Sequence, residues 1–445
     1  MTLDKKRIKP TRGEMDTETK LTRIAWLSGK DHNKTFKCLM HHIDYDRLKD
    51  NFNRLDPKKA VGIDGVTKQE YEKNLDNNLS TLLDAMKRMA YIPLPVMEHL
   101  IPKDGQPGKF RPLGISAIED KIVQGAFRQV LEAIYEPLFM NCSHGFRPKR
   151  SCHTAIKDLR KHLQDNPVEI VIDIDLKNFF GTIDHKTLEG ILREKIKDEK
   201  FIRYIIRMFK AGVLSEGELK IGDEGVPQGS ICSPILANIH AHKAIDEWVE
   251  KIIQPYCKGK VKLFRYADDA IICCEKAEDA TRIRETLPKR LAKYKLILNE
   301  EKTKMIEFSR QKVQQGIPQG AFDFLGFTFY WGKARNGRII AKLKTSGKTL
   351  RKKLVKVAEW CKKTRNKSPL KELWKTFCAK LRGHAQYYGV TFNSDMMQKF
   401  FTESKKIFFK WINRRSQKKS FTWEKFDKFM ERFPLPVARI CHPLF

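Results

Sequence analysis

The sequence predicts an α+β fold in which a mixed region of strands and helices is followed by a C-terminal region made only of helices. The strings "EIVIDIDLKNFF" (169–180) and "VKLFRYADDAIICC" (261–274) alternate or run apolar over strand lengths. Residues 117–135 instead place apolar side chains at helical spacing. From about residue 349 onwards, the spacing of apolar and basic residues predicts basic amphipathic helices. The boundary between the two regions is expected near 330–348.

The elements follow in order along the chain. We expect a polar leader at 1–50 that runs into a helix near 36–48, and a glycine-containing loop at 57–67. The remaining expected elements are a helix (68–89), a hairpin (91–115), a helix (117–135), a strand (169–180), a helix (187–209), a loop opening a long helix (224–252), a strand–turn–strand (261–274), a helix to about 294, a hairpin (323–344) and helices over 349–432 broken near 368–369 and 391–394.

Composition excludes several classes of protein. With 445 residues, 41% of them hydrophobic, the chain can bury a core, so global disorder is excluded. No stretch approaches 18 uncharged apolar residues and the N-terminus lacks an apolar signal region, which favours a cytoplasmic protein without membrane contact. The ten cysteines include no CxxC, so neither a zinc ribbon nor a disulfide framework is expected. His240 and His242 are expected on a helix surface rather than on a metal.

The positive charge is concentrated at the C-terminus. The chain carries a net charge of +33. Residues 331–445 contain 30 Lys/Arg against 7 Asp/Glu, a net of +23, and the first 330 residues contribute 57 against 47, a net of +10. Basic residues interleaved with aromatic ones favour a nucleic-acid backbone over a merely solvated helical face or an anionic membrane. Most of the rings are expected in a helix-bundle core, with neighbouring Lys/Arg making the contacts: Trp360, Trp374, Tyr387, Tyr388, Trp411 and Trp423.

Three acidic residues stand at strand ends. Asp175 ends an apolar strand, and Asp268 and Asp269 form the tip of the hairpin "LFRYADDAIICC" (263–274). If these strands are neighbours, the carboxylates converge, and hard divalent ions with oxygen ligands suit such a cluster. The alternative for the pair is an ordinary turn, where Asp is common. Asp173 shares a strand face with Asp175 and is therefore a rival to it as a metal ligand. The alternative role for Asp173 is that of a partner for a nearby Arg or Lys.

These residues carry a resemblance. "YADD" (266–269) with its preceding strand resembles the catalytic signature of reverse transcriptases. "VPQGSICSPILANI" (226–239), "GKFRPLGISAIEDKIVQ" (108–124), "HGFRPKRSCHTAI" (144–156) and "DIDLKNFFGTIDH" (173–185) are similar to blocks of the group II intron type, in the family's order. "AVGIDGVT" (60–67), "LNEEKTKMIEF" (298–308), "FLGFTF" (324–329), "LRGHAQYYG" (381–389) and "WINRRSQKKSFTWEKF" (411–426) extend the match. The chain is identified as a member of the group II intron-encoded reverse transcriptases/maturases. From its end at "ICHPLF" we expect the type that lacks an endonuclease domain.

The resemblance implies a right-hand polymerase. Residues 1–50 would be an N-terminal leader and helix, 51–330 the fingers and palm, and 331–445 a helical thumb or maturase domain. It implies RNA-directed DNA synthesis from dNTPs with two Mg²⁺ ions, Mn²⁺ being a possible substitute. The implied partners are an RNA template, a DNA or RNA primer and the parent intron RNA, whose splicing a maturase assists. Two alternatives stay open: a domesticated or defence-associated polymerase, and an RNA-binding splicing factor that needs no polymerase activity.

The resemblance also implies site residues. The catalytic metal ligands would be Asp175, Asp268 and Asp269. The nucleotide-binding residues would be Lys103, Arg111, Phe180, Gln228, Gly229 and Lys302, with Lys109 an alternative to Lys103, and Lys304 to Lys302. Phe180 would exclude a 2′-hydroxyl while Phe179 packs in the core. The RNA-binding residues would be Arg147, Lys405, Lys406, Lys410, Arg414 and Arg415, with a structural role equally open for Arg147.

Overall fold

The computed structural model describes residues 12–102, 108, 110–215, 217–415 and 421–444, including only the backbone of 12–19. The chain divides into two compact units. Unit 1 lies within Met1–Ser151, Ile174–Ile272 and Glu278–Lys304, and unit 2 within Cys152–Asp173, Cys273–Ala277 and Met305–Phe445. Each unit interleaves segments that are distant in sequence.

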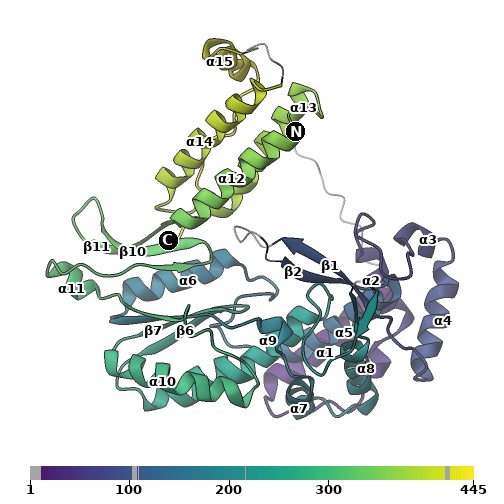
Figure 1. The fold of residues 1–445 in the computed structure, drawn as a ribbon. Coiled ribbons are helices and arrows are strands. Elements are labelled where there is room, and N and C mark those ends of the chain that lie inside the picture. The colour runs from purple at the N-terminus through teal and green to yellow at the C-terminus, as the bar shows by residue number, and fades with distance from the viewer. Residues whose placement is uncertain (1–11, 103–107, 109, 216, 416–420, 445) are drawn as a thin grey trace. The chain divides into compact units, whose positions relative to one another are not determined.

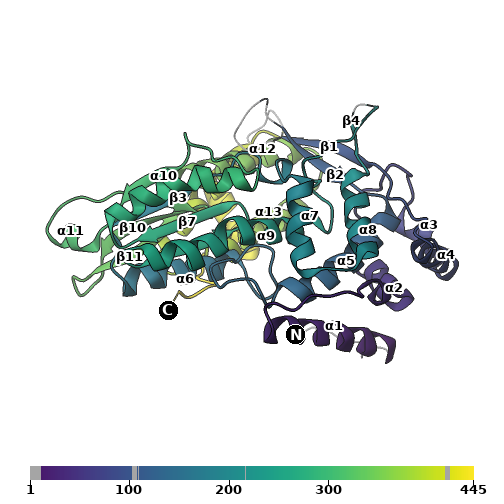
Figure 2. The ribbon, with the colours of Figure 1, turned by 90° about the horizontal axis from the view of Figure 1, so that it is seen from below.

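The N-terminal helices of unit 1 pack together (Figure 2). Helices α1 (Arg12–Lys30) and α2 (Tyr45–Arg54) contact each other and α5 (Ile118–Tyr135). The prediction of a helix near 36–48 is wrong, because α2 begins only at Tyr45. Helix α2 begins later because the Asp44 side chain accepts a hydrogen bond from the backbone N–H of Arg47, which is the N-cap arrangement that starts a helix. Helix α5 forms where it was predicted, and its apolar stripe is buried.

A four-stranded sheet of unit 1 carries the predicted hairpin. Its strands are β1 (Val96–Pro102), β2 (Phe110–Ile115), β4 (Val213–Ser215) and β5 (Glu218–Lys220), in the order β2-β1-β4-β5. Strands β1 and β2 are antiparallel, with Met97 opposite Ile115 and Ile101 opposite Arg111. The predicted nucleotide-binding residue Lys103 and its alternative Lys109 lie outside the described residues.

The other helices of unit 1 differ from the prediction at two points. They are α3 (Lys68–Glu72), α4 (Leu75–Lys87), α7 (His185–Lys195), α8 (Glu199–Lys210), α9 (Ser233–Ala241) and α10 (Ala277–Lys293). The single helix expected at 187–209 is two helices, because the Asp198 side chain caps a new helix at Phe201 N. Helix α9 continues through π-helical segments, His242–Asp246 and Trp248–Ile253. His240 and His242 are buried there rather than on the surface, which corrects the prediction.

A second four-stranded sheet carries the acidic hairpin. Its strands are β3 (Ile170–Ile174), β6 (Val261–Tyr266), β7 (Asp269–Cys274) and β8 (Lys304–Glu307), in the order β6-β7-β3-β8. The predicted strand–turn–strand is confirmed. Ile271, Ile272 and Cys273 are fully buried, as a strand covered on both faces requires.

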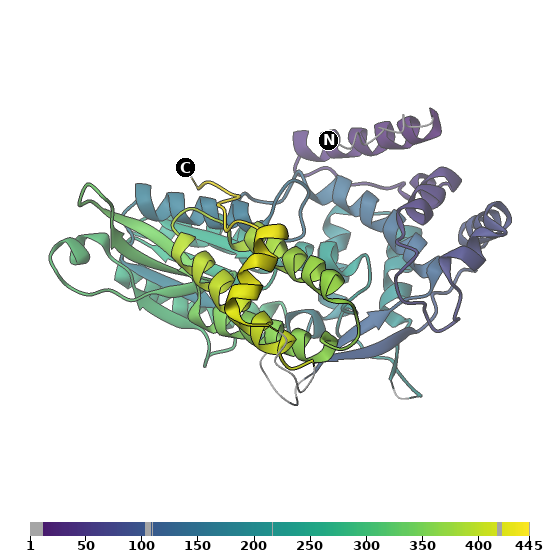
Figure 3. The same ribbon diagram turned by 90° about the horizontal axis from the view of Figure 1, so that it is seen from above.

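Unit 2 contains a three-stranded sheet and four basic helices. Its sheet order is β11-β10-β9, from β9 (Phe322–Phe324), β10 (Phe327–Lys333) and β11 (Ile339–Thr345), and its first two helices are α6 (Cys152–Asp165) and α11 (Arg310–Gln314). The C-terminal helices are α12 (Gly347–Thr364), α13 (Leu370–Tyr388), α14 (Ser394–Ile412) and α15 (Trp423–Arg432) (Figures 1 and 3). Helix α14 contacts both α12 and α13. The expected α+β class and the helical C-terminal region are confirmed.

Helix hydropathy bears on the expectation of no membrane contact. None of the helices within the described ranges is both long enough and apolar enough to cross a membrane.

Candidate active site

Two of the predicted carboxylates lie close enough to interact. Asp175 directly follows β3, and Asp268 occupies the tip between β6 and β7. Asp268 is accessible to solvent, yet surrounding protein atoms partly desolvate its carboxylate. This desolvation is the largest cause that raises the pKa of Asp268, and the negative charge of Asp175 raises it further. The positive charge of Arg111 acts in the opposite direction, so these three side chains share one electrostatic environment.

The paired carboxylates fit a divalent cation. A cation between them would relieve the repulsion that raises the pKa of Asp268, and their oxygens are the ligands that Mg²⁺ prefers. Within the described ranges, no three His, Cys, Asp or Glu side chains are grouped so as to hold a metal ion by themselves. Mg²⁺ usually takes one or two carboxylates and completes its shell with water and substrate phosphates, so a pair suffices. Asp269 is exposed at the start of β7, and its role as a ligand stays a prediction.

Asp175 is held by a segment that sequence reasoning only partly identified. Asn299 donates from Nδ2 to Oδ2 of Asp175 over 2.7 Å, and its backbone N–H donates to the Asp175 carbonyl over 2.8 Å. The Asp175 N–H donates to Oγ1 of Thr303 over 3.3 Å. Asn299 and Thr303 are both buried and were not predicted. The signal was the polar residue that ends the string "YKLILN" (294–299).

Lys302 adds an exposed charge to the same carboxylate. Its Nζ lies 3.4 Å from Oδ2 of Asp175, and its side chain is 63% exposed. The structure therefore places Lys302 beside a predicted metal ligand, while its predicted position near a leaving pyrophosphate stays a prediction. Lys304, the alternative, is the exposed first residue of β8.

Arg265, three residues before Asp268, is fully buried. Arg265 donates from Nε and Nη2 to the two carboxylate oxygens of Asp246, each over 2.7 Å. Burial disfavours the ionised form of Asp246, but the charge and hydrogen bonds of Arg265 more than offset this and lower the pKa of Asp246 to about 2. Neither residue was predicted. The available signal was an arginine on the apolar face of β6, in line with Leu263.

The two adjacent phenylalanines occupy different environments. Phe179 is buried and Phe180 is half-buried, as predicted. The strand expected over 169–180 is shorter than predicted, because β3 ends at Ile174 and the two rings lie in a 3₁₀ turn (Phe179–Gly181). The exposed ring of Phe146 meets Phe180 edge-to-face, with centroids 6.3 Å apart. Phe146 was not predicted, and only its position inside the "GFRP" block (145–148) could have signalled it.

The turn at Gln228 and Gly229 packs against β2. Gly114 N–H donates to the Gln228 carbonyl over 2.5 Å. Gly229 has a φ of +113°, and a Cβ there would overlap the Gly114 carbonyl oxygen, so this position requires glycine. Arg111 lies three residues earlier on β2 and is exposed. Strand β2 thus connects the glycine turn with a cation that acts on Asp268.

Comparison with known proteins identifies the family. Residues 101–329, about half of the chain, match the family model described as reverse transcriptase (RNA-dependent DNA polymerase). The chain belongs to the reverse transcriptase family. The match includes Asp175, Asp268 and the residues around them, whereas the four basic helices lie beyond it.

Several relatives of this reverse transcriptase family member are named as intron proteins. The chain is 36% identical over 210 residues to group II intron-encoded protein LtrA of Lactococcus lactis subsp. cremoris, covering 47% of this chain and 33% of LtrA. It is 37% identical over 208 residues to protein YkfC of Escherichia coli K12, covering 46% and 53%. It is 39% identical over 214 residues to an uncharacterized 91 kDa protein in a cob intron of Schizosaccharomyces pombe, covering 48% and 25%. The matches thus span between a quarter and about half of each relative, and the resemblance to the group II intron type is confirmed.

Arg147 has a structural role in this reverse transcriptase family member. It is buried, and its guanidinium donates to both carboxylate oxygens of Glu136 and to the carbonyls of Met140 (2.7 Å) and Ser143 (2.9 Å). These bonds occupy the group that would contact RNA. Of the two roles predicted for Arg147, the structure favours the structural one.

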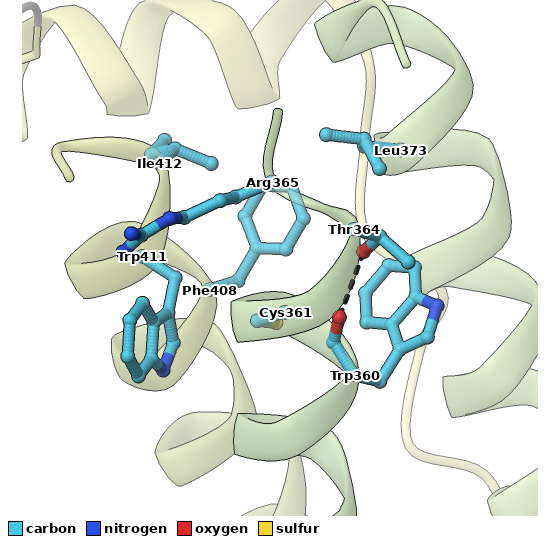
Figure 4. Close-up of a pocket in the computed structure, with 8 residues that line it drawn as sticks. All are labelled: Trp360, Cys361, Thr364, Arg365, Leu373, Phe408, Trp411 and Ile412. Carbon is cyan, nitrogen blue, oxygen red and sulfur yellow. Dashed lines mark hydrogen bonds between the residues drawn. The ribbon is translucent and has the colours of Figure 1, made fainter. Parts of the chain in front are cut away.

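The basic helices form a candidate nucleic-acid interface. Trp374 and Tyr388 are buried, whereas Trp423 is 44% exposed, so the expected core role holds for some rings and not for others. Figure 4 shows Arg365 beside Trp411. Their cation–ring distance is 5.1 Å, and Arg414 lies 5.3 Å from the same ring.

The remaining predicted RNA-binding residues also lie on α14 or just after it. Lys405 lies 5.8 Å from the Trp423 ring, Lys406 pairs with Glu403 over 2.9 Å, and Lys410 is exposed. Arg415 donates to the Ser368 carbonyl over 3.0 Å, which ties α14 to the turn before α13. Cations and partly exposed indoles therefore alternate here, as stacking and charge neutralisation of a nucleic acid would use them.

Proposed function

We propose that this protein is an RNA-directed DNA polymerase of the group II intron type. It would transfer nucleotides from dNTPs to the 3′-hydroxyl of a DNA or RNA primer paired to an RNA template. The observation that carries this proposal is the interacting pair Asp175 and Asp268, held at strand ends inside the segment that matches the reverse transcriptase family. Catalysis of this kind needs little besides positioning and charge stabilisation.

Each site residue has a role in the proposed reaction. Asp175 and Asp268, with Asp269 beside them, would hold two Mg²⁺ ions, for which Mn²⁺ could substitute. When bound, such ions activate a hydroxyl and stabilise the charge of a leaving group. Lys302 lies next to Asp175 and would balance charge near the pyrophosphate.

The other residues would bind the nucleotide. Arg111 would contact the triphosphate as a bidentate donor. Lys103, which lies outside the described residues, is also proposed to bind the triphosphate. The half-buried ring of Phe180 would exclude a 2′-hydroxyl. Gly229 would let backbone approach the nucleotide or template closely, and the Gln228 amide would hydrogen-bond to sugar or base.

We further propose that residues 331–445 act as a thumb or maturase domain that binds the parent intron RNA. In sequence order this domain would follow an N-terminal leader and helix (1–50) and the fingers and palm (51–330). The net charge of +23 in this region and the intron proteins among the relatives support this. Lys405, Lys406, Lys410 and Arg414 would contact phosphates.

The test is primer extension on poly-rA with oligo-dT, dTTP and Mg²⁺. We expect extension by the native protein and none by D175N or D268N, because each substitution removes one carboxylate charge and keeps the shape. D84N, which changes an exposed aspartate of α4, is the matched control and should extend normally. Failure of the native protein to extend the primer with either Mg²⁺ or Mn²⁺ would overturn the proposed function.

A further inference from the structure

The buried guanidinium of Arg265 has a partner for every donor. Besides the two bonds to Asp246, Nη1 donates to Oδ1 of Asn238 over 3.1 Å and to the carbonyl of Ala267 over 3.0 Å. Nη2 also donates to Oγ of Ser143 over 2.7 Å. These are the five N–H donors that a guanidinium has. We call Arg265, Asp246, Asn238 and Ser143 the arginine brace.

The brace ends on the residue before Asp268. Ala267 has a φ of +57°, a left-handed conformation that a non-glycine residue adopts only when its surroundings hold it there. Arg265 binds its carbonyl on one side. On the other side Gly145 packs so closely that a Cβ would overlap the Ala267 nitrogen. Asn238 joins the two contacts, because its Nδ2 donates to the Gly145 carbonyl over 2.7 Å.

Stability alone does not explain this arrangement. Replacing a buried ion pair by apolar side chains is often neutral or stabilising, whereas the pair fixes one geometry. Asp246 also lies in the π-helical segment His242–Asp246. Such segments are rare and occur frequently at functional sites. Both features favour a role in geometry rather than in folding.

We propose that Arg265 and Asp246 are positioning residues for Asp268. The brace holds the left-handed turn at Ala267 and so directs the Asp268 carboxylate toward Asp175. This inference rests on the proposed function only in taking Asp268 as a metal ligand. Arg265 acts through the backbone of the turn, where it binds the Ala267 carbonyl, and its positive charge also acts on Asp268.

The test separates positioning from folding with a matched double variant. R265M alone leaves the buried Asp246 without its arginine, with only the ring nitrogen Nδ1 of His242 3.6 Å from its Oδ2, so it should lower the Tm strongly. R265M/D246L removes both charges, so its Tm should return close to the native value. If the brace positions Asp268, this folded double variant should still bind Mn²⁺ about 10–100-fold more weakly, the usual cost of losing a residue that orients a metal ligand. Binding is measured by electron paramagnetic resonance of Mn²⁺ with the full-length protein, and D268A gives the background.

Two further variants keep the test decisive. S143A removes one hydrogen-bond acceptor of the brace. The substitution is small, so the variant should fold, and it should weaken Mn²⁺ binding less than R265M/D246L does. R47M changes another buried arginine of unit 1 and should lower the Tm while Mn²⁺ binding by the folded protein stays native. Native Mn²⁺ affinity in both S143A and R265M/D246L would overturn the positioning role. Because this readout is metal binding, it is independent of primer extension, whose failure would overturn only the proposed polymerase function.

Discussion

The acidic hairpin of unit 1 and the basic helices of unit 2 use charge in opposite ways. At the hairpin, a pair of interacting carboxylates is held by buried partners, Asn299 for one and Arg265 for the turn of the other. Residues 331–445 contain 30 basic and 7 acidic residues, and the basic residues predicted to bind RNA there lie at or near the surface. The hairpin lies inside the segment that matches the reverse transcriptase family and the helices lie beyond it.

This difference indicates what each region requires. Chemistry at a phosphate depends on where a few groups stand, since displacement of one group removes much of the stabilisation. Binding to a nucleic-acid backbone depends on the sum of charges, to which each cation adds a similar share. Single substitutions should therefore be severe at the hairpin and mild in the helices.

The largest expected effect tests the hairpin. D268A should reduce dTTP incorporation on poly-rA/oligo-dT by at least about 10²–10³-fold, because it removes a preorganised charge. Binding of a labelled RNA, measured by filter retention, should stay within experimental error of the native protein. A parallel loss of RNA affinity would remove the distinction between the two regions.

The second effect tests the basic helices. K405Q/K406Q/K410Q/R414Q should weaken RNA binding and make the slope of log K against log[salt] shallower by up to about 3 units, since each lost phosphate contact to a single strand contributes about 0.7. Arg415 is kept because it binds the Ser368 carbonyl. The control K186Q/K197Q/K289Q/K293Q changes the same number of exposed charges on unit 1. An equal change of slope in this control would show that the location of the charges does not matter.

The third effect concerns selectivity within unit 1. F180A should raise the incorporation of UTP relative to dTTP by roughly 10- to 100-fold, the scale of discrimination that a steric contact provides. F179L is the matched control: it alters a buried ring and should lower the Tm without changing sugar selectivity. Unchanged selectivity in F180A would withdraw the assignment of this ring.

The smallest effect tests whether an exposed charge at the hairpin behaves like those in the helices. K302A should change the free energy of unfolding by less than about 1 kcal/mol, because its contact with Asp175 is an exposed ion pair. If Lys302 also balances charge during catalysis, kcat should fall several-fold in K302A and remain native in K304A. Equal kcat values in the two variants would assign Lys302 no special role.

Local sequence patterns determined much of this protein. Apolar runs around a turn placed β6 and β7 beside Asp268, helical spacing placed α5 and the C-terminal helices but not the break between α14 and α15, and the ordered blocks led to the family that the comparison confirmed. These features depend on neighbours within a few residues, so they can be read without a structure. The surplus of cations at the C-terminus is likewise a property of composition.

Only the tertiary structure decided which residues support the site. Asn299 meets Asp175, and Asp246, Asn238 and Ser143 meet Arg265, across long stretches of chain. It also decided that Arg147 and His240 are buried. Such contacts depend on how strands and helices pair after folding, and a periodic pattern states which face of an element is covered without stating what covers it.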